Sequence, residues 1–115
     1  LLAALLEAQR SGKGQVIDVA MTEGSAYLAL ACFGLAAVGE WVDERESNHL
    51  DGGAPYWRCY ETKDGKHISI GAVEPKFYAL LLETLGIDPK SLPDQFDKAG
   101  WPAIHERFET LFKQK

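Results

Sequence analysis

Residues 56–78 read YWRCYETKDGKHISIGAVEPKFY, and this stretch decides most of the fold. Tyr56–Thr62 and Lys66–Ala72 carry the aromatic and β-branched residues that favour strands. Lys63-Asp64-Gly65 lies between them, and Asp-Gly supplies the positive φ angles of a tight hairpin turn. The pattern therefore predicts two antiparallel strands joined by a short turn.

Helix signals follow the hairpin. Pro75 suits the first position of a helix that begins at Glu74-Pro75, and Gly86 is a typical stop. Trp101-Pro102 opens a second helix near the end of the chain. Both helices carry apolar stripes at helical spacing, which are Phe77, Leu80, Leu81 and Leu85 in the first and Ile104, Phe108 and Leu111 in the second. The sequence predicts an α+β unit in which helices pack against a small antiparallel hairpin sheet.

The first part of the chain has a different character. Leu1–Arg10 predicts a helix without a capping residue, Ser11–Gly14 ends it, and Gln15–Met21 reads as a strand. Helix-turn-strand units belong to parallel sheets, and one strand cannot form a sheet alone. We therefore expect this unit to be left over from a larger doubly wound α/β domain, so that the chain is a fragment of a longer protein.

A strongly apolar helix is predicted next. Thr22 is a plausible N-cap, and the helix should extend to about Ala37 with large apolar side chains on nearly every side. A helix of this kind requires burial on all sides, which predicts a partner surface. Glu40–His49 is polar and predicts a loop, and the turn formers of Leu50–Pro55 continue it.

Composition excludes several classes of protein. The 115 residues fit one domain, and the net charge of −5 argues against a nucleic-acid partner. Cys32 and Cys59 stand far apart in no metal-binding spacing, which favours free thiols in a reducing compartment and predicts no metal site. The apolar run from Ala26 to Val38 is too short for a membrane span, and no charged leader precedes Leu1. These features predict a cytoplasmic location if the source is bacterial.

Glu74 is the strongest candidate for a functional side chain. It follows a strand and begins a helix, and functional residues often sit at such junctions because rigid elements hold both sides. The alternative is that Glu74 only caps the helix, since a carboxylate is favoured at the positive end of the helix dipole. Spacing alone leaves both interpretations open.

Other polar residues have weaker claims. His49 and His67 are candidates for acid-base work because histidine as a residue type titrates near neutral pH. A side chain without a chemical role is nevertheless the favoured interpretation of both, and for His67 this is a solvated histidine on the polar face of a strand. His105 is expected on the surface of the last helix. Asp18 lies in an apolar segment, where hydrogen bonding to a nearby loop competes with a functional role. Asp51-Gly52-Gly53 is only loosely similar to a phosphate-binding loop, because the spacing of the known fingerprints is absent.

A family resemblance rests on three segments taken together. Across nearly its whole length, the chain resembles the α-methylacyl-CoA racemases of the type III CoA-transferase (CaiB/BaiF) superfamily. The first segment is shared across the superfamily, and the other two are more specific to the racemases. Leu92–Gln95 and Trp101-Pro102 follow them in the order expected for the racemases. The three segments are Gly12–Met21, Leu50–Tyr56 and Gly71–Tyr78.

The resemblance implies an architecture and a role for one residue. Residues 1–24 would end a large CoA-binding domain, and residues 25–115 would form a linker helix and the small domain. In the family a Glu at the position of Glu74 hydrogen-bonds the catalytic His, whereas the catalytic His and Asp have no counterpart in these residues. The family further implies an acyl-CoA thioester substrate, no metal or redox cofactor, and an interlocked homodimer. We expect the 115 residues alone to be inactive.

Two alternatives to racemisation remain. A CoA-transferase of the same superfamily would move CoA between carboxylic acids through a thioester on an Asp that these residues do not contain. A non-catalytic dimerisation module would associate with itself but bind CoA weakly. Only the Gly71–Pro75 segment, which looks like that of the racemases, argues against the first alternative.

Overall fold

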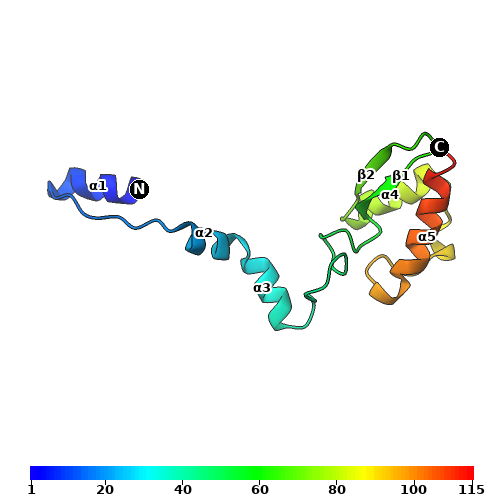
Figure 1. Cartoon of the computed structure of the whole chain (residues 1–115), viewed down its shortest axis with the longest axis horizontal. Helices are drawn as coiled ribbons and strands as arrows, with labels where there is room; N and C mark the ends of the chain where they lie inside the picture. Colours follow the sequence, from blue (N-terminus) through cyan, green and yellow to red (C-terminus); the bar gives the residue numbers. More distant parts are fainter. The chain divides into compact units, whose positions relative to one another are not determined.

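The computed structural model describes all 115 residues, and the chain divides into two compact units, Leu1–Gly39 and Glu40–Lys115. The elements are labelled in Figure 1. The first unit holds three helices, and the second holds a two-stranded antiparallel sheet, two helices and two 3₁₀ helices. In chain order they are α1 (Leu2–Ser11), α2 (Met21–Leu28), α3 (Leu30–Ala37), β1 (Trp57–Glu61), β2 (His67–Gly71), α4 (Pro75–Leu85), η1 (Pro89–Ser91), η2 (Lys98–Gly100) and α5 (Trp101–Phe112). This mixture confirms the α+β class.

In the first unit, helix α1 ends as the sequence predicted. Gly12 adopts the left-handed conformation with φ 68°, and its N–H donates to the Ala8 carbonyl. The strand predicted over Gln15–Met21 is wrong, because residues 13–20 form no regular structure and α2 already begins at Met21. A strand is defined by its pairing, and no segment of this chain pairs with these residues.

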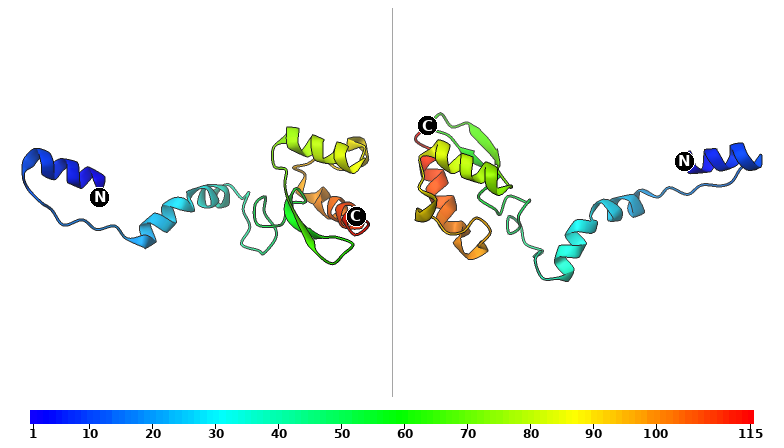
Figure 2. Two further views of the ribbon diagram at one scale, coloured as in Figure 1. Left: turned by 90° about the horizontal axis from the view of Figure 1, so that it is seen from above. Right: turned by 180° about the vertical axis from the view of Figure 1, so that it is seen from behind.

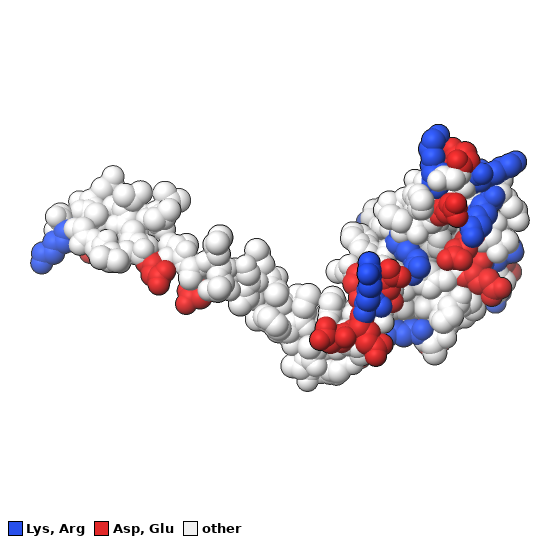
Figure 3. Space-filling model, in the orientation of Figure 1, with Lys and Arg blue, Asp and Glu red and all other residues white.

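The helix predicted from Thr22 to Ala37 is two helices that meet at Ala29. The backbone of Ala29, at φ −83° and ψ 4°, leaves the helical region between α2 and α3. Nothing in the packing explains the break. No residue of the three helices is buried within the unit, so their apolar side chains remain exposed. Figure 3 shows few charged side chains over residues 1–39 and many over residues 40–115. None of the helices is long and apolar enough to cross a membrane.

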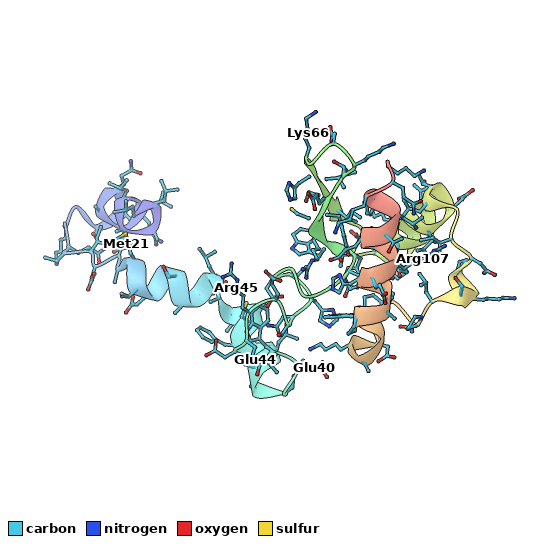
Figure 4. The ribbon with its side chains drawn as sticks, turned by 45° about the vertical axis from the view of Figure 1, so that its right-hand side comes forward. Met21, Glu40, Glu44, Arg45, Lys66 and Arg107 are labelled. Atoms are coloured by element: carbon cyan, nitrogen blue, oxygen red, sulfur yellow. The ribbon has the colours of Figure 1, made fainter.

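The hairpin forms in the second unit where the sequence predicted it. Trp57 pairs with Gly71 and Glu61 pairs with His67, while Gly65 at the turn has φ 74°. Lys66 stands at the hairpin tip, as Figure 4 shows. A Cβ on Gly71 would lie 3.2 Å from Cζ3 of Trp57, so the indole covers this glycine closely.

The core of the second unit lies between the hairpin, α4 and α5. Both views of Figure 2 place β1 and β2 beside these helices. Aromatic rings dominate, and the ring of Tyr60 on β1 lies 5.9 Å from that of Phe108 and 5.3 Å from that of Phe112 on α5. The predicted helix boundaries are confirmed, because α4 begins at Pro75, Gly86 ends it with φ 70°, and α5 begins at Trp101. The predicted apolar stripe of α4 is partly wrong, because Phe77 and Leu80 are exposed and α4 buries Tyr78 and Leu82 instead. The assignment of residues 1–24 to a larger domain stays a prediction.

Candidate functional site

The corner between β2 and α4 carries Glu74. After β2 ends, the N–H of Ala72 donates to the Tyr56 carbonyl at 2.9 Å. The Glu74 backbone is extended, at φ −72° and ψ 138°, and its carbonyl accepts from the N–H groups of Phe77 and Tyr78. Its side chain is exposed and makes no capping hydrogen bond to the helix. The main chain of Glu74 therefore starts α4 without a side-chain hydrogen bond, and both interpretations of its carboxylate stay predictions.

A buried side chain holds the segment just before Glu74. The Nε2 amide of Gln95 donates to the carbonyls of Ala72 at 3.3 Å and Val73 at 2.8 Å. The indole N–H of Trp101 donates in turn to the Gln95 carbonyl at 3.0 Å. Sequence reasoning assigned Gln95 no role. Its only signal was its place in the Leu92–Gln95 segment, which says nothing about the carbonyls it meets.

The loop before β1 is organised around the carboxylate of Asp51. This carboxylate accepts from the backbone N–H groups of Ser47, Asn48 and Gly53 and from Nδ2 of Asn48. Burial acts to raise the pKa of Asp51, but these hydrogen bonds outweigh it and the pKa is lowered. Of the backbone N–H groups in the Asp51-Gly52-Gly53 segment, that of Gly53 is bound by the Asp51 carboxylate itself, and the loose resemblance to a phosphate loop stays a prediction.

His49 stands in an aromatic cluster on the same loop. Its Nδ1 lies 2.5 Å from the Tyr56 hydroxyl, and its ring meets that of Trp101 edge-on at 5.1 Å. Partial burial, with a smaller contribution from Lys98, lowers the pKa of His49, and Glu40 opposes the shift. His49 is thus a packed side chain with a fixed partner rather than a freely solvated one.

His105 does not lie free on the surface, so that expectation is wrong. It is half-buried, and its Nε2 lies 2.8 Å from the Gly53 carbonyl, while Nδ1 lies 3.1 Å from the Tyr60 hydroxyl. The carbonyl can only accept, so Nε2 carries a proton and donates. Burial lowers the pKa of His105, and the hydrogen bond to Gly53 opposes this shift. His105 joins α5 to the Asp51 loop.

The remaining candidates are not gathered into a site. Asp18 and His67 are exposed, and the structure gives their side chains no hydrogen bond or ion pair. Cys59 is exposed and Cys32 half-buried, and both are free thiols. No group of three or more His, Cys, Asp or Glu side chains is placed to hold a metal ion. Glu74 remains the strongest candidate from the sequence, and its role stays a prediction, with an exposed side chain at the corner between β2 and α4.

Comparison with known proteins extends over the whole chain. The profile of CoA-transferase family III matches residues 1–115. The chain is 45% identical to an α-methylacyl-CoA racemase of Mus musculus and 41% identical to one of Homo sapiens, in each case over all of its 115 residues. It spans 30% of the length of each racemase. It is 34% identical over 85 residues, 74% of the chain and 21% of the relative, to a succinyl-CoA–D-citramalate CoA-transferase of Chloroflexus aurantiacus. The match over the full chain shows that this chain belongs to CoA-transferase family III.

Proposed function

We propose that the protein containing this chain is an α-methylacyl-CoA racemase, which epimerises 2-methylacyl-CoA thioesters of branched fatty acids. Identity of 45% and 41% to two mammalian racemases, without a break in coverage, carries this proposal. Because the chain spans 30% of those relatives, the activity is proposed for the whole protein, to which these residues contribute one part.

The proposed reaction is a 1,1-proton transfer. A thioester acidifies its α-proton, one base removes that proton, and an acid on the opposite face returns it to the enolate. Hydrogen-bond donors must stabilise the negative charge on the thioester oxygen while the enolate exists. None of these steps transfers an electron, so we propose that the enzyme uses no redox cofactor. We also propose, from the resemblance to the racemases, that it uses no metal and that CoA is part of the substrate.

Glu74 would act on this reaction through a histidine elsewhere in the protein. A carboxylate beside an imidazole fixes its tautomer and stabilises its charged form, which raises the pKa of the ring. Two observations support this role. The corner that carries Glu74 is held by hydrogen bonds on both sides, and the Glu74 carboxylate has no hydrogen bond or ion pair within these residues.

We further propose a homodimer. The first unit exposes large apolar side chains on all three helices and buries none of them, which is unfavourable in water. A second copy of the protein would cover part of this surface and would complete the active site.

Transfer of CoA is the second candidate, favoured by the match to the Chloroflexus transferase. One experiment separates the two. The full-length protein is incubated in D2O with a single epimer of a 2-methylacyl-CoA and a free dicarboxylate. Racemisation predicts deuterium at C2 and a mixture of both epimers. Transfer predicts CoA on the dicarboxylate with the C2 proton and configuration retained, and that result would overturn the proposal.

A further inference from the structure

We infer that Gln95 is a positioning residue for Glu74, and this inference rests on the proposed function. Gln95 does not touch the carboxylate of Glu74. It holds the two carbonyl groups that immediately precede Glu74 in the chain, at 3.3 Å for Ala72 and 2.8 Å for Val73. Its effect on the reaction would therefore pass through the position of the Glu74 backbone.

The position of Glu74 depends on this contact because little else holds its side chain. The carboxylate is exposed and unpartnered, so its location follows from the backbone at the corner. On the strand side, the Ala72 N–H is fixed by the Tyr56 carbonyl. On the helix side, the Glu74 carbonyl caps α4. Gln95 secures the stretch between these two anchors.

Gln95 itself is held firmly. The residue is 7% exposed, and its carbonyl accepts from the indole N–H of Trp101, which is 4% exposed. The loop between them is closely packed, since a Cβ on Gly100 would lie 2.3 Å from the Cβ of Pro93. The amide of Gln95 is thus presented to the corner by a part of the fold with little freedom to move.

The chemistry of the contact requires a donor. Both partners are carbonyl oxygens, and a side-chain amide offers two N–H groups to them. An ionised glutamate in the same place has nearly the same shape but offers only acceptors, so it would repel both carbonyls. A methionine would remove the donors without adding charge and would leave the two carbonyls partly unsatisfied.

The test uses the full-length enzyme with Gln95→Glu and Gln95→Met, and with Gln114→Glu as a control for charge at an exposed site. We expect both Gln95 variants to lower kcat for epimerisation by about 10- to 100-fold, as misplaced catalytic groups do, while KM changes less than about twofold. The control should keep the activity of the unmodified enzyme.

A double-mutant cycle with Glu74→Gln separates positioning from general support of the fold. If Gln95 acts through Glu74, a Gln95 substitution made in the Glu74→Gln enzyme should lower kcat by less than a further factor of about two. Loss of the carboxylate brace should also lower the apparent pKa of the catalytic histidine in the pH profile of kcat, by the same amount in Gln95→Met and Glu74→Gln. The inference would be overturned if the losses of kcat in the two single variants multiplied in the double variant. It would also be overturned if the pH profile of kcat in Gln95→Met were the same as in the unmodified enzyme.

A measurement without turnover keeps this inference distinct from the proposed function. The amide N–H groups of Phe77 and Tyr78 bond to the Glu74 carbonyl, so their hydrogen exchange reports whether the corner is fixed. Exchange should accelerate in Gln95→Met and not in Gln114→Glu. An unmodified enzyme that fails to epimerise would sink the proposed function, whereas unchanged exchange in Gln95→Met would sink the role of Gln95. Unfolding of both Gln95 variants would also contradict it, because Gln95 would then support the whole fold.

Discussion

The Nδ1 atom of His49 lies 2.5 Å from the hydroxyl oxygen of Tyr56. Tyr56 is fully buried, and burial raises its pKa to about 12, so its hydroxyl stays protonated at neutral pH. The structure gives the phenol proton no other acceptor, so we expect it to be donated to Nδ1, which places the proton of the neutral ring on Nε2. A core tyrosine thus selects the tautomer of a half-buried histidine on the neighbouring loop.

Tyr56→Phe tests this relationship. Removing the hydroxyl should release the tautomer, so nitrogen NMR should show His49 changing from the Nε2–H form to a mixture of both forms. The free energy of unfolding should fall by about 1 kcal/mol, the usual contribution of one hydrogen bond. Tyr27→Phe is the matched control, because Tyr27 is exposed and should change neither quantity. A His49 signal that stays purely Nε2–H in the Phe variant would contradict the assignment.

Acidification should destabilise the second unit in two stages. Burial lowers the pKa of both His49 and His105 below 6.5 in the folded chain, so the unfolded chain binds protons first as pH falls. Stability from these residues is complete above pH 6.5 and is lost as pH falls through their folded values. Below pH 3.8 the same argument applies to Asp51, whose pKa is also lowered in the fold.

Thermal unfolding between pH 7.5 and pH 5 should therefore show a falling Tm. The fall should be shallower in a variant with both His49→Gln and His105→Gln, even though this variant begins from lower stability. His67→Gln is the control, since His67 lies exposed on β2 and should leave the slope unchanged. A Tm that rises on acidification over this range would contradict the prediction that protonation of His49 and His105 destabilises the fold.

Tyr78 presents the opposite case to Tyr56. Its hydroxyl is buried and has no hydrogen-bond partner, and burial raises its pKa. A buried unpaired polar group opposes folding, so Tyr78→Phe should leave the free energy of unfolding unchanged or raise it by about 1 kcal/mol. Tyr60→Phe is the contrast, because the Tyr60 hydroxyl donates to the Pro55 carbonyl at 2.8 Å and its loss should destabilise. Chemical denaturation of both variants tests the pair, and clear destabilisation by Tyr78→Phe would be the contrary result.

Local signals in the sequence predicted the elements of the second unit well. The Asp64-Gly65 turn, Pro75 at the start of α4 and Gly86 at its end each act within a few residues, and the structure confirms all three. The predicted strand over Gln15–Met21 failed because strand formation depends on partners that this chain does not provide. The Glu74 corner was foreseen from the same local pattern.

The contacts that organise the site were not foreseen because they join distant residues. Gln95 reaches carbonyls 22 and 23 positions away, and His105 reaches Gly53 across 52 positions. No periodicity or motif around either residue predicts its hydrogen-bond partner. An amide or an imidazole that is buried by the fold requires a hydrogen-bond partner. Which partner it finds depends on tertiary packing, which the local sequence does not show.

Glu74→Gln in the full-length protein tests the proposed brace. The change keeps size and shape but removes the charge that would stabilise an imidazolium, so epimerisation should slow by about 10-fold or more. Stability should change little, because the Glu74 side chain makes no hydrogen bond in this structure. Glu83→Gln, at an exposed position on the same helix, should leave turnover unchanged. Equal turnover by Glu74→Gln and the unmodified enzyme would mean that Glu74 only starts the helix and has no role in the reaction.

The exposed helices of the first unit predict association of the 115-residue polypeptide. Tyr27 is 77% exposed, Leu28 is 85% exposed and Phe33 is 57% exposed, and the intervening residues from Ala26 to Val38 carry no charge. Apolar surface of this extent is removed from water when two copies meet. Sedimentation should show dimers or larger species, and Leu28→Asp together with Phe33→Asp should shift them toward monomer. Lys13→Asp, a charge change outside this run, should not. A monodisperse monomer at micromolar concentration would mean that this surface is not sufficient to bring two copies together.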